Sequence, residues 1–316
     1  MKMRAQEVNY DAKTTRSNRY PKITKLGVCS PYGEETPFVW NGKLMRMELR
    51  DPMKGWEQTD TTVDKDAIIR DVETGEIISH LAADSYYHSA YIEGDTAYVL
   101  GVDLLSRDTI RIYSSKDLIH WDNRVLFTNP GWVYCNTGLT KGPDGYVLML
   151  EAAEPAQYVG EHPYTFVFAT SPDLQTWTHM DPNLAYPMDR YAGAPWFRYA
   201  DGWYYAIMLV ELPCVRYTNY LFRTKDFVNW EVGNYNPILM PSEEDHILSP
   251  NAADITPEFF AEIQNCFNIN NSDIDMCDYN GKVYINYLCG NQLGMYYMCE
   301  AEAEGTVASF LASYFE

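Results

Sequence analysis

Long apolar segments are missing from this sequence of 316 residues. No run of about 18 apolar residues occurs, so we expect no membrane-spanning helix. Residues 1–21 also lack the apolar stretch of about 7–15 residues that a secretory signal requires. The sequence as it stands therefore predicts a cytoplasmic protein.

Paired cysteines are missing as well. The seven cysteines form no CxxC pair, and their odd number does not suggest a disulfide framework. We expect reduced, partly buried thiols and no metal site built on them. The cysteines are Cys29, Cys135, Cys214, Cys266, Cys277, Cys289 and Cys299.

Positive charge is scarce. The chain has 24 Lys and Arg against 44 Asp and Glu, which gives a formal net charge of -20. Such a surface repels phosphate backbones and anionic lipids, so we expect neither a nucleic acid nor a membrane as partner. Basic residues do recur in residues 1–25, but polar residues dilute them, and we interpret this segment as a solvated N-terminal arm.

Several catalytic signatures are also absent. The sequence contains no P-loop, dinucleotide-binding fingerprint, HExxH or GxSxG motif. NTPase, Rossmann oxidoreductase, zincin and serine-hydrolase activities therefore have little support.

What the sequence does contain is internal repetition. A phrase of the form SxDLxxW occurs in residues 115–121 and 171–177, and the variant TxDFxxW occurs in residues 224–230, with starts 56 and 53 residues apart. Each copy follows a β-rich run and precedes a short extended segment, as expected of a turn between the outer strands of a sheet. The aspartate can cap the turn, and the tryptophan can pack between neighbouring sheets.

A second repeat is a turn glycine followed by alternating aromatic and aliphatic residues. Its glycines are separated by 52, 51, 57 and 79 residues, near the length of a four-stranded propeller blade. We therefore predict an all-β fold, a five-bladed β-propeller with four-stranded antiparallel blades, as a single domain over residues 26–316. The glycines are Gly42, Gly94, Gly145, Gly202 and Gly281.

The longest of these intervals contains an insertion. Residues 256–265 are predicted to form a short helix, because Thr256 can serve as N-cap and Pro257 suits the first helical position. No second helix is expected.

The two repeats together resemble the five-bladed propellers of glycoside hydrolase families 43, 32, 62 and 117, over residues 28–315. Residues 136–145 and 270–275, with the later 290–292, are similar to segments of bacterial proteins labelled putative glycosidases. The resemblance implies a hydrolase of carbohydrate metabolism that acts on an oligo- or polysaccharide.

Polar residues are concentrated just before each hairpin glycine, where the innermost strands of a propeller begin around a shared channel. Glycoside hydrolysis needs a proton donor, a carboxylate base or nucleophile, and groups that bind sugar hydroxyls. We predict catalytic roles among Glu34, Glu35, His88, Asp273 and Asp275. We predict substrate binding by Asn136, Asp189, Arg190, Tyr191, Asn291 and Gln292.

The resemblance to family 43 implies an aspartate base in the first blade, a supporting aspartate in the third and a glutamate acid in the fourth. The corresponding positions hold Glu34 or Glu35, Asn136 and Gly193, so two carboxylates are missing. We expect Glu34 or Glu35 to act as base. For the acid we favour Asp273, because Asp275 on the same strand face could raise its pKa.

His88 is the alternative acid, and family 117 offers a precedent for a histidine in that role. Each candidate also has a structural interpretation. Glu34 and Glu35 can be surface loop residues, and His88 can be a histidine of the core. Asp273 and Asp275 can cap a turn, Arg190 can neutralise nearby acids, and Asn291 and Gln292 can serve a turn.

Two other functions stay open. A non-catalytic carbohydrate-binding propeller would explain the missing carboxylates, and a glycoside phosphorylase could use Arg190, His88 and Lys141 to bind phosphate. We expect no cofactor. A structural calcium ion in the channel stays open as an alternative, because Asp and Asn oxygens suit calcium. Formation of a homo-oligomer is left open too.

Overall fold

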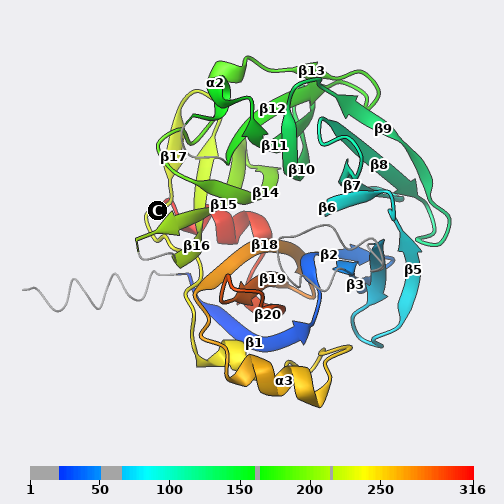
Figure 1. Cartoon of the computed structure of the whole chain (residues 1–316), viewed down its shortest axis with the longest axis vertical. Coiled ribbons are helices and arrows are strands. Elements are labelled where there is room, and N and C mark those ends of the chain that lie inside the picture. The colour runs from blue at the N-terminus through cyan, green and yellow to red at the C-terminus, as the bar shows by residue number, and fades with distance from the viewer. Residues whose placement is uncertain (1–20, 51–65, 161–163, 214–215) are drawn as a thin grey trace, which may run out of the picture.

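A computed structural model of the protein describes residues 21–50, 66–160, 164–213 and 216–316, which form mainly β-strands joined by short connections (Figure 1). Residues 1–20 of the expected N-terminal arm and Cys214 lie outside the described residues. The first strand begins at Ile23, slightly before the expected start of the domain at residue 26.

Three sheets contain four antiparallel strands each, paired in the order of the chain. The first has β2 (Gly33–Trp40), β3 (Lys43–Arg50), β4 (Asp66–Asp71) and β5 (Ile77–Leu81). The second has β6 (Ser85–Glu93), β7 (Thr96–Asp103), β8 (Thr109–Ser115) and β9 (Asp122–Thr128). The third has β10 (Val133–Gly142), β11 (Gly145–Glu154), β12 (Thr165–Ser171) and β13 (Thr178–His179).

The remaining eight strands form two further groups of four, which a single parallel pair between Tyr217 and Asn270 joins into one sheet. The fourth group is β14 (Ala192–Ala200), β15 (Trp203–Leu212), β16 (Arg216–Thr224) and β17 (Trp230–Val232). The fifth is β18 (Asn270–Tyr279), β19 (Lys282–Gly290), β20 (Tyr296–Glu304) and β1 (Ile23–Ser30). Strand β1 thus pairs, antiparallel, with β20, the last strand of the described residues.

The innermost strand of each group contacts the innermost strand of the next: β2 with β6, β6 with β10, β10 with β14, β14 with β18, and β18 with β2. Apolar side chains fill the space between consecutive groups. Met47 and Val99 belong to the cluster between the first two groups, and Ile207 and Ile285 to the cluster between the last two. Their burial is the main favourable term that holds the groups together.

Local turn chemistry agrees with the sequence repeats. The repeated SxD phrases lie between the third and fourth strands of their groups, as expected. In the first of them, Asp117 Oδ1 accepts hydrogen bonds of 2.8 Å from the backbone N–H groups of Ile119 and His120. Asp173 and Asp226 cap their turns in the same way.

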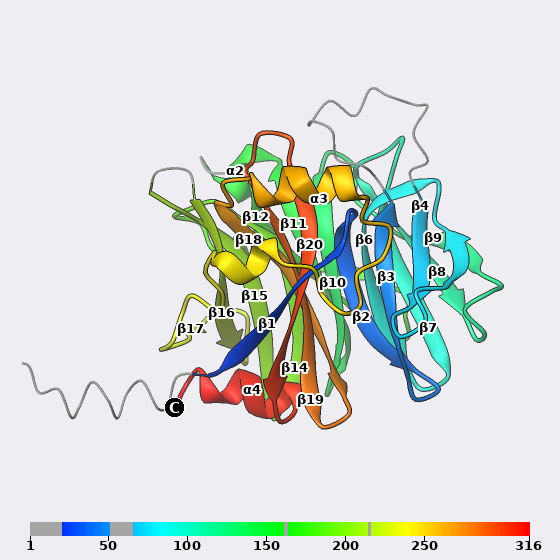
Figure 2. The same ribbon diagram turned by 90° about the horizontal axis from the view of Figure 1, so that it is seen from below.

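The predicted helix is present as α3 (Pro257–Gln264), and Thr256 Oγ1 accepts a hydrogen bond of 3.1 Å from Phe259 N. A C-terminal helix α4 (Val307–Ser313) was not expected. The two lie at opposite ends of the molecule, with α3 at the end where the innermost strands begin (Figure 2). The shorter turns are α2 (Ala156–Val159), η1 (Pro182–Leu184) and η2 (Glu243–His246).

None of the helices in the described residues has the length and apolar character needed to cross a membrane.

Between the first group and the fifth, the interface contains buried ion pairs beside a small apolar cluster of Leu44, Val72 and Tyr284. Buried Arg46 contacts Glu48 at 2.9 Å, Glu35 at 3.3 Å and Glu300 at 3.7 Å. Arg70 contacts Glu48 at 2.7 Å. We call Glu35, Arg46, Glu48, Arg70 and Glu300 the buried ion cluster.

A second buried ion pair fixes β1. Lys25 Nζ lies 2.7 Å from Asp245 Oδ1, and the side chain of Asp245 is fully buried. Tyr287, Asn268 and the backbone N–H of Ser242 also donate hydrogen bonds to this carboxylate. In the described residues, Lys25 is the cation that balances the charge of Asp245.

Lys25→Met should lower the free energy of unfolding by about 3–5 kcal/mol, because it leaves a buried carboxylate without its cation. Urea unfolding measures the change. Lys43→Met is the matched control: Lys43 also pairs with an aspartate, Asp71, but its side chain is 61% exposed, and its loss should matter far less. Equal losses in the two variants would contradict the importance of the buried pair.

Candidate active site

The innermost strands are irregular near their starts. The pairing register shifts in β2, β6, β14 and β18 at a residue with positive φ, namely Glu34 (48°), Tyr87 (56°), Ala194 (49°) and Asp273 (47°). Strand β10 has register shifts between residues 133 and 137. Bulges of this kind redirect side chains, and positive φ at residues other than glycine is common where backbone strain serves a site.

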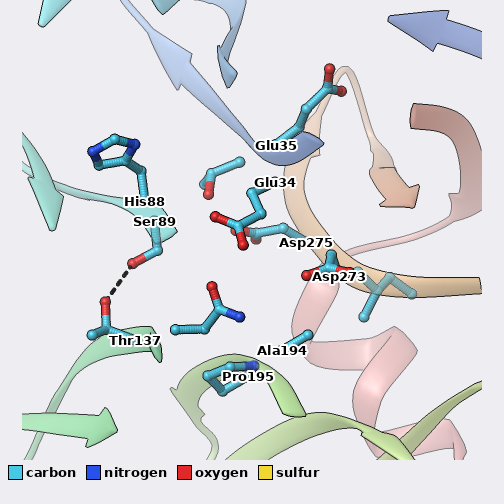
Figure 3. Close-up of a pocket in the computed structure, with 12 residues that line it drawn as sticks. Glu34, Glu35, His88, Ser89, Thr137, Ala194, Pro195, Asp273 and Asp275 are labelled. Carbon is cyan, nitrogen blue, oxygen red and sulfur yellow. Dashed lines mark hydrogen bonds between the residues drawn. The ribbon is translucent and has the colours of Figure 1, made fainter. Parts of the chain in front are cut away.

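One pocket of about 40 Å³ lies among these bulges (Figure 3). It brings together residues that are far apart in the sequence, including six of those predicted above. Its lining consists of Glu34, Glu35, Thr36, His88, Ser89, Asn136, Thr137, Ala194, Pro195, Asp273, Ile274 and Asp275.

The two adjacent glutamates differ in orientation. The carboxylate of Glu34 points into the pocket, toward Asp275, whereas that of Glu35 points away (Figure 3). Glu35 belongs to the buried ion cluster, 3.3 Å from Arg46. Burial raises the pKa of Glu35, and the positive charge of Arg46 opposes this shift. Glu34 is therefore the carboxylate of the first sheet that can meet a bound molecule.

Asp273 and Asp275 both line the pocket, and burial raises the pKa of each to about 6. The expected cause was wrong for Asp273. Its pKa is raised by burial and lowered by a hydrogen bond from Ser272, without a contribution from Asp275. The bulge at Asp273 interrupts the alternation that would have placed the two side chains on one strand face. For Asp275, the charge of Arg198 opposes the effect of burial.

His88 lines the pocket with its ring turned away from the carboxylates (Figure 3). Its Nε2 lies 2.9 Å from Ser85 Oγ, and the ring packs against Gly101, where an added Cβ would lie 2.6 Å from His88 Cδ2. Burial lowers the pKa of His88 to about 4, so the imidazole is neutral near pH 7. Both features are unfavourable for a proton donor.

Other predicted residues are not among those that line the pocket. Arg190 and Asp189 form an exposed ion pair with a contact of 2.5 Å. The ring of Tyr191 packs edge to face against Tyr164 and Tyr217.

The two predicted residues of the β19–β20 hairpin serve that turn. Asn291 Oδ1 accepts hydrogen bonds from the backbone N–H groups of Leu293 and Met295. Gln292 accepts a hydrogen bond from the hydroxyl of Tyr296. Asn291 also lines a separate groove of about 460 Å³ beside α3.

The sequence reasoning missed Glu151 of β11. Its carboxylate accepts hydrogen bonds of 3.0 Å from Asn136 Nδ2 and from Ala194 N, and both donors belong to residues that line the pocket. Burial raises the pKa of Glu151 to about 7, and Asp273 adds to the shift. A single acidic residue inside the apolar strand 146–152 was a usable signal, because isolated buried acids are rare.

A metal could be held by one cluster of the described residues, namely Asp245, Cys289 and Cys299. The Asp245 carboxylate there is already occupied by Lys25 and by three hydrogen-bond donors. A metal ion would have to displace the ammonium group of Lys25. We therefore interpret Asp245 as the partner of Lys25 in an ion pair and not as a metal ligand.

No family model matches the sequence, and no curated protein matches it. Solved structures do match. One described as a glycoside hydrolase has a TM-score of 0.62 at 11% identity, covering 95% of this chain and 97% of that one. A thermostable family-43 glycoside hydrolase has a TM-score of 0.59 at 11% identity, covering 90% and 93%. The family 32 β-fructofuranosidase BmSUC1 of Bombyx mori has a TM-score of 0.54 at 11% identity, covering 93% and 66%.

The chain therefore shares the fold of these glycoside hydrolases, which belong to β-propeller families, as the sequence resemblance implied. The all-β class and the four-stranded antiparallel sheets are confirmed.

Asp273 should make stability depend on pH. Its folded pKa of about 6 lies above the ordinary value of 3.8, so its stabilising contribution is complete below pH 3.8 and is lost as the pH rises through 6. Relative to Asp273→Asn, the wild type should gain about 1 kcal/mol of unfolding free energy between pH 7 and pH 5. Urea unfolding at both pH values measures this difference.

Asp278→Asn is the control for this measurement, because Asp278 lies on the same strand but is exposed. A difference between wild type and Asp273→Asn that does not change with pH would show that Asp273 titrates like an ordinary carboxyl.

Proposed function

We propose that the protein is a glycoside hydrolase whose five groups of four strands form the blades of one closed propeller over residues 23–316. The chain of contacts from β2 through β6, β10, β14 and β18 back to β2 supports closure. The pairing of β1 with β20 supports it as well, because it completes the fifth group with a strand that precedes the first group in the sequence.

The observation that carries the proposal is the meeting of three carboxyl groups in one pocket. Glu34 comes from the first group, and Asp273 and Asp275 come from the fifth. Glycoside hydrolysis uses one carboxyl as acid and another as base or nucleophile, and the acid needs a raised pKa. A pKa of about 6 leaves part of the Asp273 population protonated near neutral pH.

In this proposal Asp273 donates a proton to the leaving glycosidic oxygen. Glu34 acts across the pocket as base on water or as nucleophile on the sugar. Ser89 and Thr137, whose hydroxyl oxygens lie 3.1 Å apart, and Asn136 provide hydrogen-bonding groups for the sugar. The substrate class is an oligo- or polysaccharide.

A non-catalytic carbohydrate-binding propeller is the second candidate. Asn136 and Gly193 support it, since they occupy positions where the family 43 resemblance implies carboxylates.

A phosphorylase has less support. In the described part of the chain, the pocket lining contains no Lys or Arg, and Arg190 pairs with Asp189 outside it.

Asp273→Asn should lower kcat on glycosides with poor leaving groups by about 100- to 10,000-fold, the usual effect of removing a general acid. Activated aryl glycosides need less protonation and should be affected less. Initial rates on an aryl-glycoside and oligosaccharide panel, with and without phosphate, measure this. Asp278→Asn, at the far end of the same strand, should keep wild-type rates.

Wild-type turnover by Asp273→Asn on a natural glycoside would remove Asp273 as the acid. Tight glycan binding without turnover by the wild type would favour the binding module. Turnover that requires phosphate would favour the phosphorylase.

A further inference from the structure

Glu151 lies directly behind the pocket, with 3% of its surface exposed. It belongs to the second strand of the third group. One of its oxygens, Oε2, accepts hydrogen bonds from Asn136 of β10 and from the backbone N–H of Ala194 of β14, both at 3.0 Å. A single buried carboxyl thus connects two adjacent innermost strands at the edge of the pocket.

The backbone of β14 leaves room for this carboxyl. A Cβ added at Gly193 would lie 3.2 Å from Glu151 Oε1 and 3.2 Å from the hydroxyl of Tyr191. Any other residue at 193 would crowd both groups. The glycine therefore allows Glu151 to approach the strand closely enough to bond the N–H of Ala194.

The bond to Glu151 fixes which way the amide of Asn136 faces. An ionised carboxylate only accepts hydrogen bonds, so it must meet Nδ2 of the amide and not Oδ1. The reversed amide would place Oδ1 against Oε2 of Glu151 and would lose the bond. Within the described residues no donor bonds to Asn136 Oδ1, and Asn136 lines the pocket.

We infer that Glu151 is a positioning residue that holds the Asn136 amide with Oδ1 toward the pocket, where it accepts a hydrogen bond from a substrate hydroxyl. The identification of that hydroxyl as part of a sugar rests on the proposed function. The orientation of Asn136 does not.

The candidate acid lies close enough to act on the same carboxyl. Burial raises the pKa of Glu151 to about 7, and the negative charge of Asp273 adds to that shift. Ionisation of Glu151 strengthens the bond to Asn136, since charged acceptors make stronger hydrogen bonds. The titratable groups that face Glu151 are Asp273, Cys135, Tyr87, Tyr164 and Tyr191.

A double-mutant cycle tests positioning through Asn136. Glu151→Gln should lower kcat/KM by about 10- to 100-fold, the effect of losing a hydrogen bond to a charged group. In an Asn136→Ala background the same change should cost less than about 2-fold, because nothing is left to position. Equal losses in both backgrounds would overturn the inference.

Glu93→Gln is the matched control. Glu93 also accepts bonds from the neighbouring strands, from Lys141 and Tyr146, but it is not among the residues that line the pocket. It should leave kcat/KM unchanged. If the wild type turns over no glycoside, the proposed function fails.

The double-mutant cycle is then measured on binding instead of turnover. The Kd values of the four proteins are compared for arabinose, xylose, galactose, glucose and fructose.

A measurement on the unliganded protein decides the geometry independently of any activity. The side-chain amide resonances of Asn136 should shift with a midpoint near pH 7, the pKa of Glu151, and Glu151→Gln should abolish that shift. Asn136 side-chain amide resonances that Glu151→Gln leaves unchanged, in folded protein, would overturn the inference even if glycosides are hydrolysed.

Discussion

The buried ion cluster between the first and fifth groups of strands determines much of what the pocket can do. Arg46 and Arg70 are removed from water together with Glu35, Glu48 and Glu300, and their mutual contacts and hydrogen bonds to neighbouring groups offset that cost. Glu35 thus contributes to the contact between the first and fifth groups through Arg46. Its neighbour Glu34, turned by the bulge in β2, is thereby the acid that faces the pocket. Adjacent residues with the same side chain thus have separate tasks.

The fold was largely predictable because its signals are local. Hairpin glycines need positive φ, and the SxD turns need an aspartate that caps two backbone N–H groups, so both leave a residue-level mark at each repeat. The pocket was partly predictable for the same reason, since most of its residues lie just before those hairpins. Arg190 and Asn291 lie near hairpins too, but their partners in space draw them into an ion pair and a turn.

The rest of the site depends on contacts between groups that no local pattern reveals. Glu151 lies behind the pocket on a second strand, and its importance depends on Asn136, Ala194 and the space left by Gly193. The bulge at Asp273 likewise follows from pairing with β19, so strand alternation could not predict its surroundings. Burial, which only the assembled fold supplies, raises the pKa of both Asp273 and Asp275.

The pairing of β1 with β20 has a consequence for biosynthesis. Ile23 is opposite Ala303, so β1 must wait on the ribosome until the distant strand β20 has been made before its partner emerges. Until then the nascent chain carries an unsatisfied strand edge, which can associate with other chains. Closing so long a loop also slows folding. Completion of this ladder is therefore a late step of folding at which a chaperone would protect the exposed edge.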